Sequence, residues 1–260
     1  MLTLQYENGI IGSGNLATHL SVAMKEAGMP PIQVYSPNLS HAQQLAERIG
    51  CEATNKRENV IMDADAYIIS IKDDAISDVA EWLGRDRVGA TLIHTAGSIS
   101  IDELTRSVTH AGVLYPMQTF SKDTSLNFRE IPIFVEYSDE VSKDVVMTIA
   151  NAVSDRVTET DSAKRKKMHL AAVFACNMTN HCYRLAEKIT EEEGIDFSLF
   201  APLIMETARK ATIMSPHDAQ TGPMKRHDIG VMNMQKELIA NPLTKEIYDL
   251  MAKSVWADSA

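Results

Sequence analysis

A short glycine loop constrains the fold of this chain more than any other feature of its sequence. The segment GIIGSGNLATHL, residues 9–20, places Gly12, Gly14 and Ala17 between an apolar stub and a stretch of helical periodicity. In a strand–turn–helix unit, the first glycine permits the tight turn and the second lets a pyrophosphate approach the backbone. The third small residue lets helix and strand pack closely. A helix N-terminus also favours a bound phosphate. The alternative interpretation is a tight turn without a ligand.

The first 155 residues alternate apolar runs with helix-like segments, which indicates a parallel sheet covered by helices on both faces. The expected strands are Gly9–Ile11, Ile32–Tyr35, Ala66–Ile71, Thr91–Thr95, Gly112–Tyr115 and Ile131–Val135. The expected helices are Leu16–Ala27, His41–Ile49, Ala75–Leu83 and Val141–Val153. One irregularity is the polar stretch Glu7-Asn8-Gly9, which interrupts the first strand.

The pattern changes in the second part of the chain, where β-branched runs almost disappear. Helical segments are expected at 163–193, 197–213, 224–239 and 243–257, separated by glycines and prolines. We therefore predict an α/β fold class, with an N-terminal Rossmann parallel sheet followed by an all-α C-terminal domain. The predicted domains are a nucleotide-binding domain at 1–155 and a helical substrate and dimerisation domain at 156–260.

The end of the second strand favours NADP over NAD as the cofactor. Rossmann proteins that prefer NAD carry a carboxylate there for the ribose hydroxyls. This chain has Val34-Tyr35-Ser36-Pro37-Asn38, in which Ser36 and Asn38 could donate hydrogen bonds to a 2′-phosphate. Pro37 stands where an arginine would be expected. The alternative is that Ser-Pro-Asn only forms a turn and a helix start.

Further cofactor contacts are expected where other parallel strands end, because ligands of open α/β sheets bind at that edge. His94 has an alternative role as a buried structural imidazole. The full set of predicted cofactor residues is Gly12, Ser13, Gly14, Asn15, Leu16, Ser36, Asn38, Ser70, Ile71, Lys72, His94 and Thr95.

Composition excludes several other classes of function. The net charge of −10 argues against a nucleic-acid surface. The sequence contains no apolar stretch near the ~18 residues of a membrane span. Three cysteines without metal-type spacing, and a start without a signal-peptide pattern, predict a reduced, cytoplasmic protein with no metal site.

Five motifs in order resemble one known group of proteins. They are GSGNLATHL, HTAGS, LYPMQTFS, KRKKMHLAAVFACNMTNH and TGPMKRHD, spread over nearly the whole chain. They resemble bacterial Rossmann-like NADP oxidoreductases with a C-terminal helical domain of unknown function. These proteins are related to pyrroline-5-carboxylate reductase and ketopantoate reductase. The resemblance implies NADP binding by the first domain and a homodimer formed through the helical one.

The helix around His169 carries the candidate catalytic residues. At 100° per residue, His169, Cys176 and Asn180 share one stripe among apolar neighbours. Polar groups in such surroundings need hydrogen-bond partners, which a substrate could supply. We predict His169 as the general acid, Asn180 as a residue that orients the substrate, and Lys166 as the partner of a substrate carboxylate. The alternative is that His169 and Asn180 bond each other or the backbone and only fix the helix.

The sequence thus predicts an NADP-dependent reductase that transfers a hydride to a small carboxylated imine or keto acid. The alternatives are a non-catalytic NADP-binding sensor and a dimeric binding module. The residues expected to touch the substrate are Ser98, Tyr115, Gln118 and Asn177.

Overall fold

A mostly parallel eight-stranded sheet forms from the first part of the chain in this computed structural model, which describes residues 6–259. The strand order is β3-β2-β1-β4-β5-β6-β7-β8, and all neighbours pair in parallel except β6 and β7, which are antiparallel. The strands are β1 (Asn8–Ile11), β2 (Gln33–Tyr35), β3 (Glu52–Thr54), β4 (Ala66–Ile69), β5 (Thr91–His94), β6 (Ala111–Pro116), β7 (Ile133–Tyr137) and β8 (Val157–Glu159).

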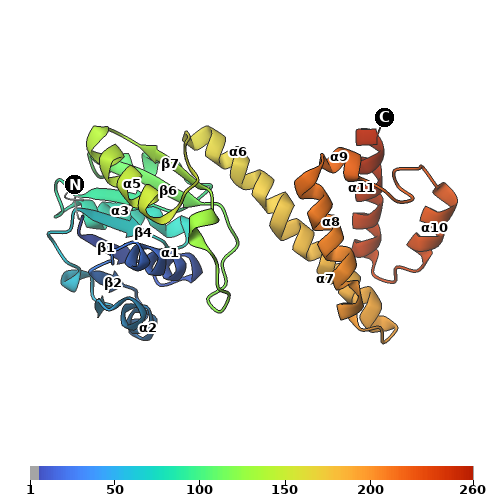
Figure 1. Cartoon of the computed structure of the whole chain (residues 1–260), viewed down its shortest axis with the longest axis horizontal. Helices are drawn as coiled ribbons and strands as arrows, with labels where there is room; N and C mark the ends of the chain where they lie inside the picture. The colour runs from blue at the N-terminus through green and yellow to red at the C-terminus, as the bar shows by residue number, and fades with distance from the viewer. Residues whose placement is uncertain (1–5, 260) are drawn as a thin grey trace. The chain divides into compact units, whose positions relative to one another are not determined.

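Helices cover both faces of this sheet (Figure 1). Neighbouring residues of the central strands contribute to two separate cores: in β1, Ile10 packs with α1, α2 and α5, whereas Ile11 packs with α3 and α4. The helices are α1 (Asn15–Glu26), α2 (Leu39–Ile49), α3 (Ile76–Gly84), α4 (Asp102–Thr105), α5 (Glu140–Val153) and α6 (Ser162–Ala172). Short 3₁₀ turns are η1 (Arg57–Asn59), η2 (Asp73–Ala75) and η3 (Phe128–Glu130).

The predicted fold class is confirmed, with differences in detail. β3 and β8 were not predicted, and the predicted sixth strand runs antiparallel. The polar stretch before the glycine loop does not break β1, because Asn8 and Gly9 both pair with β4. A Cβ added to Gly9 would lie 3.1 Å from the ring of Tyr67, so a side chain there would press on β4.

The chain divides into two compact units, the first reaching Cys176 and the second beginning at Asn177. This division comes later than the domain boundary expected after residue 155, since β8 extends the sheet and Arg165 of α6 bonds to Glu136 of β7. The second unit is helical: α7 (Thr179–Glu192), η5 (Phe197–Phe200), α8 (Ala201–Ile213), α9 (Pro216–Ala219), α10 (Ile229–Glu237) and α11 (Pro242–Ser259). No helix within residues 6–259 is long and apolar enough to cross a membrane.

Candidate functional site

A cavity of about 780 Å³ lies along the carboxyl edge of the sheet in the first unit. The segments following β1, β2, β4 and β5 line it, together with side chains from β6 and α6. Because β2 and β6 lie on opposite sides of β1, β4 and β5, the cavity spans roughly 19 Å, four strand spacings. It brings together these predicted site residues: Gly12, Ser13, Gly14, Asn15, Leu16, Ser36, Ser70, Ile71, Lys72, Thr95, Tyr115 and His169.

The glycine loop fits the pyrophosphate of a dinucleotide. Gly12 has a φ of +121°, and a Cβ there would lie 2.1 Å from the carbonyl oxygen of Ser70, so only glycine is tolerated. A Cβ at Gly14 would meet nothing within 4 Å, which leaves its backbone open to the cavity. No side chain caps the start of α1, so the N–H groups of its first turn are available to an anion.

The loop is also joined to the end of β2. The backbone N–H of Gly12 donates to the carbonyl oxygen of Tyr35 at 2.8 Å. The hydroxyl of Ser13 donates to that of Ser36 at 3.0 Å. Ser36 is therefore held next to the glycine loop, where the ribose of a dinucleotide would lie.

At the β6 end of the cavity, Tyr115 and His169 form a hydrogen-bonded pair. The phenol oxygen lies 3.0 Å from Nδ1 of the imidazole, and the ring centroids are 5.8 Å apart. Burial raises the pKa of Tyr115, and the charge of Arg165 opposes this shift without reversing it, so the phenol keeps its proton at neutral pH. Gly97 makes room for the pair, because a Cβ there would lie 2.5 Å from His169 Nδ1 and 2.9 Å from Tyr115 Cζ.

A buried ion pair fixes the helix that carries His169. Arg165 is fully buried and donates to Glu136 of β7, to the carbonyl oxygen of Ile99, and to the hydroxyl of Ser162 at 3.1 Å. The basic run at 164–167 contains Arg165 and three lysines. Its three lysines are exposed, but the arginine points into the first unit.

His94 is buried at the end of β5 and does not line the cavity. Its Nδ1 accepts the backbone N–H of Ala96 at 3.2 Å. Burial, assisted by the charge of Arg165, lowers the pKa of His94 to about 3, so the imidazole is neutral. His94 therefore lies in the structure as a buried imidazole, which was the alternative to a cofactor contact.

Other predicted residues lie outside this cavity lining. Asn38 caps α2 by accepting the backbone N–H of His41 at 3.2 Å. Ser98 donates to Asp73, and the side-chain oxygen of Gln118 accepts the backbone N–H of Thr119. The exposed residues Lys166, Asn177 and Asn180 are also absent from the lining, and the last two belong to the second unit.

The predicted stripe on the His169 helix assumed one α-helix throughout. Between α6 and α7 the chain instead forms a π-helical segment, η4 (Val173–Met178). A π turn holds more residues than an α turn, so the rotation per residue is smaller than 100°. The arithmetic that aligned His169 with Asn180 does not apply across η4.

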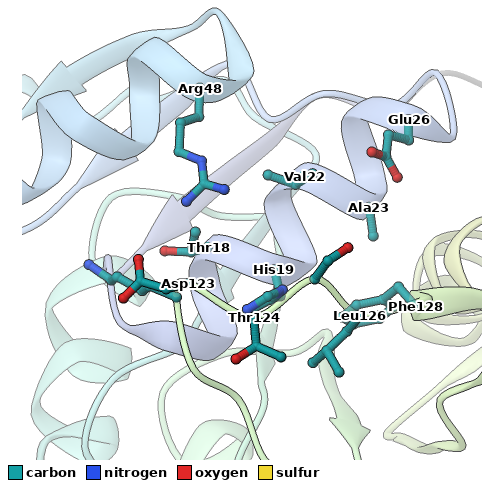
Figure 2. Close-up of a pocket in the computed structure, with 12 residues that line it drawn as sticks. Thr18, His19, Val22, Ala23, Glu26, Arg48, Asp123, Thr124, Leu126 and Phe128 are labelled. Atoms are coloured by element: carbon teal, nitrogen blue, oxygen red, sulfur yellow. The ribbon is translucent and has the colours of Figure 1, made fainter.

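A second cavity, of about 670 Å³, lies between α1, α2 and the segment 122–128. Figure 2 shows Arg48 from α2 facing Thr18 and His19 of α1 across it. Glu26, Lys122 and Asp123 add charges of both signs. It contains none of the predicted site residues.

Among the lining residues that sequence reasoning did not predict, two bear on the chemistry of the first cavity. Gly97 adjoins the Tyr115–His169 pair, and Arg57 of η1 lines the cavity near the β2 end. The HTAGS motif contains Gly97, so its glycine was the available signal. Arg57 had no such signal, because it follows β3, a strand of three residues that showed no clear pattern.

The sheet order, which reverses at β1 and β4, and the glycine loop define a Rossmann-type nucleotide-binding protein. Comparisons with known proteins extend this assignment. Residues 7–97 match the family described as NADP oxidoreductase, coenzyme F420-dependent, and residues 131–255 match a domain of unknown function, DUF2520. A structure from Bacteroides fragilis, assigned as an NADP oxidoreductase, is 39% identical over 97% of this chain and 98% of that one, with a TM-score of 0.92. The chain belongs to this oxidoreductase family, as the resemblance implied.

Two more distant structures share the fold. An imine reductase from Myxococcus stipitatus in complex with NADP⁺ is 14% identical, covering 96% of this chain and 92% of that one, with a TM-score of 0.65. A pyrroline-5-carboxylate reductase from Coxiella burnetii is 16% identical, covering 98% and 97%, with a TM-score of 0.60. A comparison with curated proteins found no match.

Proposed function

We propose that this oxidoreductase uses NADPH to reduce a small carboxylated imine or keto acid. The observation that carries the proposal is that one cavity is lined both by the glycine loop after β1 and, at its β6 end, by the Tyr115–His169 pair. The relative assigned as an NADP oxidoreductase supports the cofactor, and the imine reductase and pyrroline-5-carboxylate reductase structures motivate the choice of substrate.

The cofactor would be held by the glycine loop, Ser36 and the segment 95–97, and when bound it supplies the hydride. The chain's own residues supply the proton. In the proposed arrangement the Tyr115 phenol is the donor to Nδ1 of His169, and the imidazole carries a proton on Nε2. As the Nε2 proton passes to the imine nitrogen or carbonyl oxygen, Nδ1 takes up the phenol proton, so the imidazole stays protonated once and the negative charge ends on the Tyr115 oxygen.

Lys166 is the proposed ion-pair partner of the substrate's carboxylate, and it lies one turn before His169 on α6. An exposed ammonium attracts such a group without a burial cost. Asn177 and Asn180 remain proposed substrate contacts from the second unit.

Turnover of a substrate panel tests this function. Cyclic imines and 2-keto acids, each with and without a carboxylate, are mixed with NADPH or NADH, and loss of the reduced cofactor is followed by absorbance. We expect turnover only with carboxylated members. For a productive substrate, His169→Ala should reduce kcat by about 10²- to 10⁴-fold, the usual contribution of a general acid. Unchanged kcat in this variant would remove His169 from the acid role.

We also propose a homodimer formed through the second unit. Within its described residues, the only buried hydrophobic side chains are Met232, Ile239 and Ala252. Its exposed large hydrophobic residues include Leu199, Leu203, Met205, Leu238, Leu243, Leu250 and Met251. So many exposed apolar side chains around so small a core favour burial against a second copy. Sedimentation equilibrium should give twice the monomer mass, and a monomer at micromolar concentration would refute the proposal.

A further inference from the structure

A positively charged side chain that sequence reasoning did not predict there, Arg57, lines the β2 end of the cavity. A 2′-phosphate is normally bound by an arginine near the end of the second strand. In this chain Pro37 follows Ser36, and Asn38 is used as the cap of α2. A serine hydroxyl alone offers a phosphate one donor and no charge.

Arg57 reaches this end of the cavity through β3. Strand β3 pairs in parallel with β2, with Thr54 opposite Tyr35, and the N–H of Ser36 donates to the carbonyl oxygen of Thr54 at 3.1 Å. The Thr54 hydroxyl then accepts the N–H of Lys56 at 3.1 Å, which turns the chain immediately before Arg57. Ser36 and Arg57 consequently line the same cavity.

An aromatic side chain holds the guanidinium without occupying its donors. The Arg57 guanidinium carbon lies 5.1 Å from the ring centroid of Trp82, and that ring also contacts Tyr35 at 5.4 Å. Arg87, which is buried and bonded to backbone carbonyls, lies 5.7 Å from the same ring. Among the residues that the structure describes, the Arg57 guanidinium has no hydrogen-bond or ion-pair partner, so its side-chain N–H groups are free for a ligand; only the backbone carbonyl of Arg57 is bonded, to the N–H of Val60.

The charged residues of the cavity lining do not neutralise the Arg57 guanidinium. Among the described residues lining the cavity, Asp73 is the one carboxylate, and it accepts the hydroxyl of Ser98 beyond β4. No carboxylate of the lining therefore lies at the β2 end to bond ribose hydroxyls or to repel a phosphate.

We infer that Arg57 and Ser36 form the 2′-phosphate site and make the protein selective for NADP(H) over NAD(H). This inference rests on the proposed function, since it assumes that the cavity binds a nicotinamide nucleotide. A guanidinium can give a phosphate two parallel hydrogen bonds, which are among the stronger contacts in proteins. The stack on Trp82 limits the rotamers that Arg57 must give up on binding.

Calorimetric titration of the full-length protein tests the assignment. NADPH and NADH are compared first, followed by adenosine 2′,5′-bisphosphate and AMP, which lack the nicotinamide. Arg57→Ala should weaken NADPH and the bisphosphate by about 10- to 100-fold, the range for a hydrogen bond to a charged group. NADH and AMP should change by less than about twofold. Arg57→Lys should lose part of this affinity, because it keeps the charge but not the paired donors.

Arg85→Ala is the matched control, because Arg85 is an exposed arginine of the same unit that pairs with Glu81 away from the cavity. It removes the same charge and should leave the NADPH to NADH ratio unchanged. Equal weakening of both cofactors in Arg57→Ala, or wild-type affinities that do not favour NADPH, would overturn the inference and leave the proposed reductase standing. Failure of the wild type to bind either cofactor would overturn both.

Discussion

Mild acid should destabilise the first unit through His94. Its pKa is lowered from 6.5 to about 3 by burial and by Arg165. Between these two values the unfolded chain binds a proton that the folded chain does not, so the free energy of unfolding rises with pH. His94 therefore does not reduce the free energy of unfolding above about pH 6.5, but it reduces it progressively as the pH falls toward 3. From pH 7 to pH 5 the loss from this one group is about 2 kcal/mol.

Urea denaturation at pH 7, 6 and 5 measures this loss. Trp82 fluorescence in a Trp256→Phe background reports the first unit, since the chain has two tryptophans. His94→Asn is the matched variant, because its side-chain oxygen can accept the Ala96 N–H that Nδ1 accepts in the wild type. Asp139 does not interfere, because its pKa is lowered from 3.8 to about 2 and its contribution is lost only below this window. Parallel pH profiles for the two proteins would refute the reasoning.

Three further substitutions test the cavity and the buried ion pair of α6. Gly12→Ala should weaken NADPH binding by more than about tenfold in calorimetry, because its φ is +121° and the loop must move. Gly97→Ala should lower kcat while circular dichroism stays native, because the new methyl group displaces His169; overpacking of this kind costs about 1–3 kcal/mol. Arg165→Met should lower the free energy of unfolding by about 3–5 kcal/mol, measured in urea, by leaving Glu136 without its buried partner. Adding Glu136→Gln to that variant should recover part of the loss.

The pattern of apolar runs was sufficient to predict the order of the main elements. Periodicity located α1, α2, α3 and α5 to within two residues at each end, because each has one clearly apolar face. It missed β3 and β8, which have three residues each and are partly exposed, so they offer too little alternation to detect. The reversed direction of β7 depends on the connection from β6 rather than on the residues of the strand.

The site was predictable where it depends on one local motif. The glycine loop and the strand ends after β4 and β5 belong to this class, and most of their residues line the cavity. Arg57 and the Tyr115–His169 pair depend on contacts between distant segments. The pair joins residues 54 positions apart, and no local pattern encodes that contact. The π segment likewise cannot be read from a helical wheel that assumes one rotation per residue.

The buried arginine explains why α6 places His169 where it does. Glu136 and the carbonyl of Ile99 bind Arg165 from the sheet side, and His169 follows one turn later on the same helix. A buried ion pair is weak evidence for added stability, since desolvation offsets most of the attraction. Here the ion pair fixes the register of α6 against the sheet, because a shift of α6 by a single residue would carry the guanidinium away from both acceptors. The same shift would carry the imidazole away from Tyr115. Within the basic run 164–167, the buried Arg165 therefore fixes the position of α6, and the three lysines lie on its solvent-exposed face.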